Sequence, residues 1–302
     1  MLDVFNTSSG GALLLRNESI EGDIRKRAFY KIGGALTHRD VTTDATVSGT
    51  KIGAGEMIGV KHPWKYGPYQ TTEEAFKRRA RSPEEFSELV GQDMADAALD
   101  YYVQAAFAAL DAAIGSNANM VASASFATDH KKVLTKGMRK FGDRFNRIAL
   151  FGMDSTTYFD LVDDAIDEKI YEEAGVVIYG GSPGTMGKPV LVSDRIPASK
   201  IFGLQGGAVT LTESQAPGVR SYLINDQENL ALGYRAEGAF NVDVLGYSWK
   251  EASGVNPTLA ALGASANWSK YATSDKVTAG VVINLSGGSS ASASASASGS
   301  GA

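Results

Sequence analysis

Apolar residues recur at helical spacing over residues 82–114, and this periodicity predicts one long helix. Its start is well specified, because Ser82 can cap the helix, Pro83 suits the first position and Glu85 completes a capping box. Gly115 predicts the stop through a left-handed conformation. Two adjacent apolar stripes predict burial on more than one side. They comprise Phe86, Leu89, Val90, Met94, Ala97, Tyr101, Ala105, Ala108 and Ala112, and then Leu99, Val103, Phe107, Leu110 and Ile114.

The chain before this helix has two segments of different composition. Residues 1–35 mix Gly, Ser and Asn and are typical of an arm, in which the mixed-charge segment 20–30 predicts a short helix. Alternating β-branched residues across 36–69 predict two strands around Ser48–Gly49, a hairpin with little core to cover. Because a two-stranded hairpin alone is marginal in water, we expect it to pack on another subunit; a hairpin folded back on its own domain is the alternative. Residues 72–81 predict a short basic helix.

A basic run at residues 128–147 follows the long helix, with acidic residues before and after it. The formal net charge of -5 argues against a dedicated nucleic-acid binder, and the run lacks the interleaved aromatic residues of a single-strand platform. Charge pairing within or between chains is the expected use, and a solvated face is the alternative. Our candidates for contacts between subunits are Lys61, Lys65, Arg78, Arg79, Lys136, Arg139, Lys140, Asp93, Asp96 and Asp163.

The next segment predicts a strand, a turn and a helix. Residues 148–151 are a buried strand, and Asp154 or Ser155 caps a helix with Tyr158, Leu161, Val162 and Ile166 on one face. Two strands, Val176–Tyr179 and Val190–Val192, then flank a Gly-rich turn. This turn is not a phosphate loop, because five residues intervene where four are required and a proline replaces the Ser or Thr that would bind Mg²⁺.

From residue 201 the chain predicts mostly long antiparallel strands, with sustained alternation over 239–244. A short helix begins at Asn256–Thr258, Trp268 is a candidate aromatic anchor, and 276–285 predicts a last strand. The sequence beyond it is low in complexity and typical of a linker.

Composition excludes several kinds of chemistry. The 302 residues contain no Cys, so thiolate metal sites and Cys nucleophiles are absent, and the three His residues show no ligand spacing. No stretch approaches a membrane span or a signal peptide, and no cofactor loop is found. We therefore predict no enzyme, no cofactor and no membrane partner. A carboxylate-dependent enzyme is the less favoured alternative, built from acids such as Asp154, Asp163 and Asp164.

The order of these parts resembles a tailed-bacteriophage major capsid protein of the Hong Kong 97-type fold, over residues 20–285. ALFGMDSTTYFDLVD and GKPVLVSDRIP resemble the strand, helix and loop of its axial domain, and NPTLAAL and GVVINL resemble the returning portion. Residues 82–114 resemble the spine helix of its peripheral domain. The resemblance lies in texture and order, because the family has no invariant catalytic signature to compare. A long core helix in an ordinary domain is the alternative for residues 82–114.

The resemblance implies an α+β chain divided into the parts of that fold. The implied division is 1–35 for an amino-terminal arm, 36–81 for an extended hairpin loop with its short basic helix, 82–147 and 205–250 for the peripheral domain, 148–204 and 251–285 for the axial domain, and 286–302 for a Ser/Ala/Gly tail.

The implied function is that of a major capsid subunit, made in the host cytoplasm and located in the virion capsid. Its copies would assemble into hexamers and pentamers of an icosahedral shell that encloses double-stranded DNA, contacted without sequence specificity. Portal, scaffolding and decoration proteins are the other implied partners. Some members join a loop Lys to an Asn of another subunit, but no residue here marks such a pair. An encapsulin-like shell, which would enclose cargo protein, is the alternative from another class.

Overall fold

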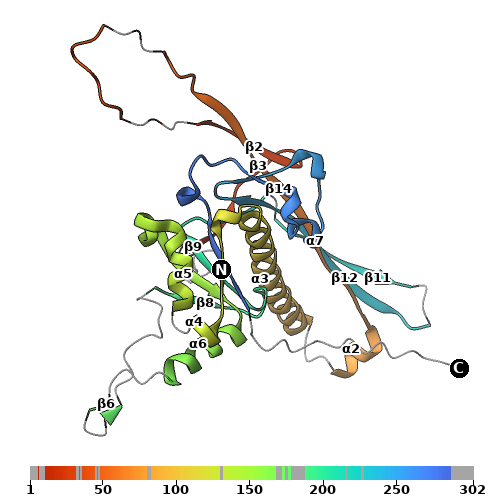
Figure 1. Cartoon of the computed structure of the whole chain (residues 1–302). Helices are drawn as coiled ribbons and strands as arrows, with labels where there is room; N and C mark the ends of the chain where they lie inside the picture. Colours follow the sequence, from red (N-terminus) through yellow and green to blue (C-terminus); the bar gives the residue numbers. More distant parts are fainter. Residues whose placement is uncertain are drawn as a thin grey trace, which may run out of the picture.

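The computed structural model describes most of the chain, in thirteen segments. They are residues 6, 11–31, 34, 36–44, 46, 48–79, 83–129, 132–167, 172–173, 176–177, 188–214, 216–225 and 228–286. Two large sheets lie on either side of the long helix 83–115 (Figure 1). Two pairs of strands project from them: 24–31 with the first part of 53–72, and 218–224 with the first half of 231–244.

The larger sheet has six strands, and its longest members run antiparallel to each other. In order across the sheet the strands are β1 (Leu13–Asn17), β10 (Val209–Glu213), β12 (Ala231–Val244), β3 (Gly53–Thr72) and β2 (Ile24–Lys31), and β11 (Gly218–Ile224) pairs with the first half of β12. The predicted long antiparallel strands after residue 201 are thus confirmed.

The second sheet has five strands and is covered by helices. Its order is β4 (Val121–Ala124), β15 (Gly280–Leu285), β9 (Lys200–Gln205), β5 (Ile148–Met153) and β8 (Val190–Val192). Helix α5 (Lys132–Phe141) packs on β15 and β4, and α6 (Ser155–Asp167) follows β5 as predicted, with Leu161 buried. The side chain of Ile166 lies outside the described residues. Helix α4 (Phe126–Asp129) contacts both α5 and α6.

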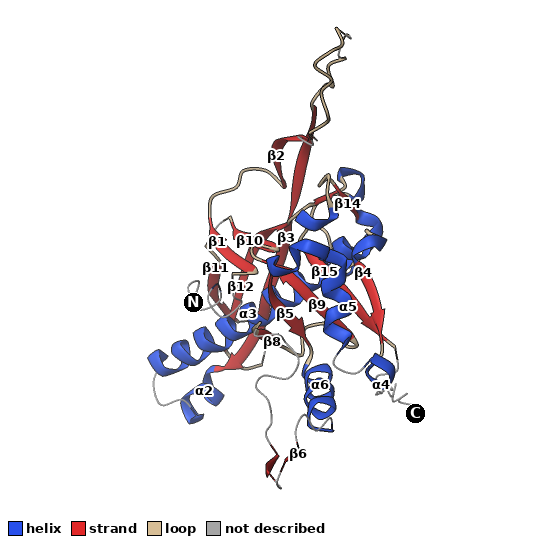
Figure 2. Cartoon of the chain, turned by 60° about the vertical axis from the view of Figure 1, so that its left-hand side comes forward, coloured by secondary structure: helices blue, strands red, loops and turns tan. Residues whose placement is uncertain are grey.

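The predicted long helix is α3 (Pro83–Gly115), and it starts at the proline expected in its first position. Ser82 and the side chains of Glu85 and Phe86 lie outside the described residues. The second half of α3 is the centre of the core, where its small residues allow β10, β12 and β15 to approach closely (Figure 2). Its fully buried side chains are Ala105, Ala106, Phe107, Ala109, Leu110, Ala113 and Ile114.

The returning part of the chain closes the core between the two sheets. Strands β13 (Tyr247–Trp249) and β14 (Trp268–Lys270) pair with each other. The indole rings of Trp249 and Trp268 lie edge to face, with 5.3 Å between their centroids. The Nε1 of Trp268 donates to the carbonyl of Leu262 at 2.8 Å, so the predicted anchor is confirmed. Helix α7 (Leu259–Leu262) is capped by the Thr258 hydroxyl.

The shorter helices complete the chain. Helix α2 (Glu73–Arg79) confirms the predicted short basic helix. The short 3-10 helices are η1 (Ala118–Met120), η2 (Gly142–Arg147), η3 (Glu251–Ser253), η4 (Ser265–Asn267) and η5 (Asp275–Val277).

The hairpin uses a different first strand from the one we predicted. Residues 20–30 do not form a helix, because Ile24–Lys31 is strand β2 and pairs with the beginning of β3. The described residues between 36 and 52 form no strand. Local sequence favoured the wrong element, because the hydrogen bonds that hold β2 come from a strand about thirty positions away.

The two strands predicted around the Gly-rich turn are present in the described residues as β7 (Val176–Val177) and β8. Each pairs elsewhere: β7 with β6 (Glu172–Glu173), and β8 in parallel with β5. The Gly-rich turn between them lies outside the described residues. The predicted left-handed stop of α3 is corrected. Helix α3 ends at Gly115 without a left-handed residue there, because the amide of Asn117 donates to the carbonyl of Ile114 at 2.9 Å.

Candidate assembly surfaces

The β2–β3 hairpin and its loop extend beyond the two sheets (Figure 1). Large apolar side chains on this element are exposed, among them Tyr30, Leu36, Val41 and Ile52. A projecting element with exposed apolar side chains gains little stability from burial within its own chain. Such a surface is typical of a contact with another molecule.

Charged residues tie the base of the hairpin to the body. Arg25 pairs with Glu18 at 2.8 Å, and Lys26 pairs with Glu251. The Nζ of Lys61 donates to the carbonyl of Ile20 at 2.7 Å. The candidate Lys61 therefore binds within its own chain at the hairpin base.

A buried polar cluster lies where β2, β3 and β12 meet. A guanidinium nitrogen of Arg25 lies 3.7 Å from a carboxylate oxygen of Asp243, across Gly59 of β3. A Cβ on Gly59 would stand 1.9 Å from an Asp243 oxygen and 2.7 Å from the Asn241 amide nitrogen, so only glycine fits. Burial raises the pKa of Asp243, and the Arg25 charge opposes this shift. Among the described residues, no hydrogen-bond partner reaches the side chains of Asp243 or Asn241.

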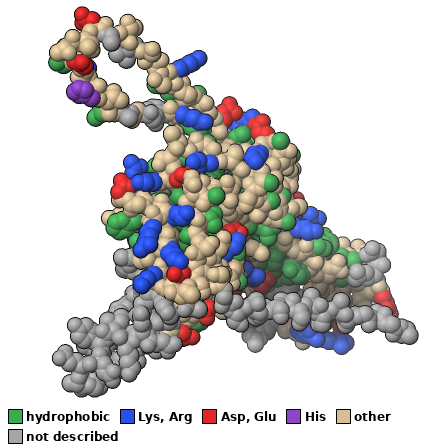
Figure 3. Space-filling model, viewed as in Figure 1, with side chains coloured by type: hydrophobic (Ala, Val, Ile, Leu, Met, Phe, Trp, Pro, Cys, Tyr) green, Lys and Arg blue, Asp and Glu red, His purple; other side chains and the backbone are tan. Residues whose placement is uncertain are grey.

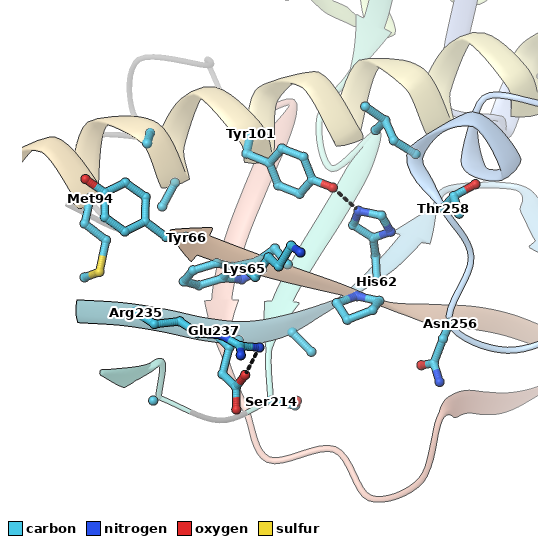
Figure 4. Close-up of a pocket in the computed structure, with 18 of the residues that line it drawn as sticks. His62, Lys65, Tyr66, Met94, Tyr101, Ser214, Arg235, Glu237, Asn256 and Thr258 are labelled. Atoms are coloured by element: carbon cyan, nitrogen blue, oxygen red, sulfur yellow. Dashed lines mark hydrogen bonds and ion pairs between the residues drawn. The ribbon is translucent and has the colours of Figure 1, made fainter. Parts of the chain in front are cut away.

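The first half of α3 leaves an apolar groove between itself and the sheet. The groove has a volume of about 1020 Å³ and lies between α3, β3, β12 and α7. Figure 4 shows Met94 and Tyr101 of α3 facing Lys65 and His62 of β3 across it. Leu89, near the helix start, is 58% exposed, so our expectation that it is buried is wrong for the single chain. The apolar stripes of α3 are therefore covered only in its second half.

His62 fixes the inner end of this groove. Its Nδ1 lies 2.8 Å from the carbonyl of Pro257, and its Nε2 lies 2.6 Å from the hydroxyl of Tyr101 (Figure 4). These contacts suit a neutral imidazole that donates from Nδ1 and accepts the tyrosine proton at Nε2. Burial lowers the pKa of His62, which favours the same neutral form.

The acidic candidates of α3 have different surroundings. Asp93 and Asp96 are both exposed, and Asp93 accepts a hydrogen bond from the hydroxyl of Tyr66 on β3. The neighbouring helix acids pair with cations outside the basic run: Asp100 with Arg195 at 2.7 Å, and Asp111 with Lys200 at 2.6 Å. Within the described chain, the acidic face of α3 and the basic run therefore do not meet.

The basic run is largely a surface feature of α5. Lys136 pairs with Asp129 at 2.5 Å, inside the run itself. Arg139 and Lys140 are exposed and pair with none of the described acids. Figure 3 shows Lys and Arg side chains spread over the side of the molecule that carries α5. These two cations are thus free to meet another molecule.

The remaining candidates are also on the surface. Arg78 pairs with Glu74 one turn away on α2, at 2.9 Å. Lys65, Arg79 and Asp163 are exposed. The structure places the candidates on several separate surfaces and does not bring them together into one site.

Sequence reasoning missed the polar cluster at the hairpin base. The alternation over 239–244 was visible, but it indicated one apolar and one polar face. In the structure both faces are covered, so Asn241 and Asp243 are buried together with Phe240 and Val242. No local signal connects Arg25 or Gly59 to them, because the cluster exists only through strand pairing.

Neither a metal centre nor a membrane-spanning helix is found in the part of the chain that the structure describes. No group of three or more His, Cys, Asp or Glu side chains among the described residues could hold a metal ion. No helix of the described chain has the length and apolarity needed to cross a membrane.

Comparison with known proteins gives a family and a fold. The family described as Major capsid protein 13-like (Gp13-like) matches residues 1–282. No curated protein matches the sequence. Similar solved structures include one from Microbacterium phage Oxtober96, with 11% identity and a TM-score of 0.57, covering 90% of this chain and 89% of that chain.

Two further structures are similar at low sequence identity. The asymmetric unit of the bacteriophage PhiM1 mature capsid has 8% identity and a TM-score of 0.56, covering 92% of this chain and 86% of that chain. The capsid structure of cyanophage P-SCSP1u has 12% identity and a TM-score of 0.51, covering 91% and 86%. The chain therefore belongs to the Major capsid protein 13-like family, shares a mixed helix and strand fold with phage capsid structures, and is a structural capsid subunit.

Proposed function

We propose that copies of this chain assemble into hexamers and pentamers of an icosahedral phage shell that encloses double-stranded DNA. The observation that carries the proposal is the projecting hairpin, whose exposed apolar residues include Leu36 and Val41. A neighbouring copy is the natural cover for them, because a capsid subunit is always surrounded by identical chains. The exposed half of α3 with Leu89 offers a second apolar surface to such neighbours.

The finer form of the fold is the Hong Kong 97-type arrangement. In it, α3 is the spine helix of a peripheral domain, 82–147 with 205–250, and the five-stranded sheet forms the axial domain, 148–204 with 251–285. One adjustment is needed, because β4 and α5 fall within 82–147 and pack on the five-stranded sheet.

The two ends of the chain form the amino-terminal arm and the carboxy-terminal tail of this arrangement. The arm 1–35 contributes β1 to the six-stranded sheet and β2 to the hairpin, whose loop lies in 36–81. The tail 286–302 lies outside the described residues except for Ser286.

The proposal places the mature protein in the virion, after synthesis in the host cytoplasm. Portal, scaffolding and decoration proteins would meet it at the shell, and the DNA would contact its inner surface without sequence specificity.

The experiment is to express the chain, purify it by size, and image it by negative-stain electron microscopy with an assay of nucleic acid in the particles. The proposal expects closed shells of uniform size and, in the infected host, double-stranded DNA inside them. Protein that stays monomeric at all concentrations contradicts a shell. Shells that hold cargo protein in place of DNA indicate an encapsulin-like compartment.

A further inference from the structure

Strand β11 is an outer edge of the six-stranded sheet. One side of the strand pairs with residues 231–237 of β12. On its other side, no strand in the described part of the chain pairs with it. Figure 1 shows β11 at the margin of the sheet, away from the five-stranded sheet. An unpaired edge presents a row of backbone N–H and C=O groups, which is a template for another strand.

Strand β11 exposes large apolar side chains as well as Arg220 and Ser221, although unused edges are usually protected by charge, proline or a covering element. Val219 and Leu223 are four residues apart, so their side chains lie on the same face of the strand, and they are 55% and 66% exposed. On the other face, Tyr222 lies over Gly233, where a Cβ would come within 2.5 Å of the ring. The edge is therefore a strand with exposed apolar side chains that nothing in the described chain covers.

Arg220 adds a charged group to this edge of the sheet. It lies directly opposite Arg235 of β12, and Arg235 already pairs with Glu237 at 2.9 Å. Arg220 forms no ion pair with a described residue. Two cations side by side favour a partner strand that brings an aromatic ring or an acid to Arg220.

We propose that β11 pairs antiparallel with β11 of a second copy of the chain, about a two-fold axis beside Ser221. This contact would join the six-stranded sheets of two subunits into one continuous sheet. This pairing rests on the proposed function only because it requires copies of the chain to be in contact. A two-fold contact uses the same patch twice, so the patch must be self-complementary, and β11 satisfies this condition.

The complementarity fixes the register. Directly opposite side chains of an antiparallel pair share a face, so a two-fold axis must pass beside a residue that opposes its own copy. With Ser221 at the axis, Val219 opposes Leu223 of the second copy, and Arg220 opposes the ring of Tyr222. An axis beside Arg220 would set Val219 against Ser221, and an axis beside Tyr222 would set Leu223 against Ser221. Only the Ser221 axis matches apolar with apolar and cation with aromatic.

The test uses single cysteines in a chain that has none. Residues that oppose each other in an antiparallel pair have Cα atoms about 4.5 to 5.5 Å apart, within the range of about 4.4 to 6.8 Å in which a disulfide closes. Ser221→Cys protein, oxidised with diamide, should give covalent dimers as the main product on a non-reducing gel. Val219→Cys or Leu223→Cys alone should not, whereas an assembly mixed from these two variants should cross-link.

Crosslinks are measured both in particles and in the soluble fraction, so the pairing is judged whether or not shells form. Particles in which Ser221→Cys fails to cross-link, or cross-links no better than Val219→Cys, overturn the β11 pairing and leave the shell intact. Protein that forms no particles overturns the proposed function, and a Ser221→Cys dimer in solution would still support the pairing. Thermal unfolding of each variant, expected within a few degrees of the parent, confirms that the exposed substitutions leave the fold unchanged.

Discussion

Arg25 on β2 and Asp243 on β12 form an ion pair across Gly59, with 3.7 Å between guanidinium nitrogen and carboxylate oxygen. Three strands that are distant in sequence meet at this point. The missing side chain of Gly59 provides the room for the contact. The hairpin therefore leaves the sheet from a base built around one glycine.

Gly59→Ala should weaken this base. The new Cβ would overlap the Asp243 carboxylate, so either that side chain or β3 must move, at a cost of about 1 to 3 kcal/mol in the free energy of unfolding. Chemical denaturation of the unassembled subunit measures the loss, and hydrogen exchange should show faster exchange in β2. Gly53→Ala on the same strand is the control, because a Cβ there meets only ordinary contacts at 3.6 Å. Equal stability of the two variants would argue against the cluster.

His62→Gln should change how stability depends on pH. Burial lowers the pKa of His62 below its ordinary value of 6.5, so the folded state favours the neutral ring. Its contribution is therefore complete above pH 6.5 and is lost as pH falls through the lowered value. Denaturation curves between pH 5 and 8 should show a smaller loss at acid pH in the variant. Tyr101→Phe removes the 2.6 Å contact but keeps the imidazole, so it should retain the acid dependence. Identical pH profiles for His62→Gln and the parent would contradict the assignment.

Leu110→Ala tests the buried half of α3. Leu110 is fully buried, so truncation should cost about 2 to 5 kcal/mol through lost apolar contact and a cavity. Asp96→Asn, on the exposed side of the same helix, should change the stability of the subunit by about 0.5 kcal/mol or less. Soluble yield and thermal unfolding compare the two. An Asp96→Asn that unfolds the subunit would mean that the helix faces the other way.

The exposed cations of α5 offer a test of charge between subunits. The triple reversal of Lys136, Arg139 and Lys140 to Glu should give folded protein that fails to form particles. The double variant Arg139→Glu, Lys140→Glu is the sharper version, because Lys136 already pairs with Asp129. Each exposed pair contributes about 0 to 1 kcal/mol, but the contact repeats in every copy, so assembly of the parent should also weaken with salt. Normal particle counts from the double variant would remove these cations from the interface.

The elements with strong local patterns were predictable. The start of α3 at Pro83, its helical periodicity, and the strand and helix that meet near Asp154 follow from residues within one or two turns of each other. Trp268 was also identifiable as an anchor, because a lone indole in an otherwise small-residue segment has few other uses.

The hairpin strand and the sites could not be predicted. Strand β2 has too little apolar periodicity to identify it, and its partner lies in β3. The burial of Asp243 depends on β12 being covered on both faces, which no stretch of sequence shows. Leu89 fits the helix stripe, but no described residue covers it, so the prediction of burial from periodicity alone failed.

A structure of the assembled particle by electron cryo-microscopy decides whether this chain builds a shell through its projecting hairpin. Most contacts of the loop around Leu36 and Val41 should be with another copy of the chain. A hairpin that folds back onto its own α3 would exclude this role of the hairpin, and a chain that forms no particle would exclude the shell.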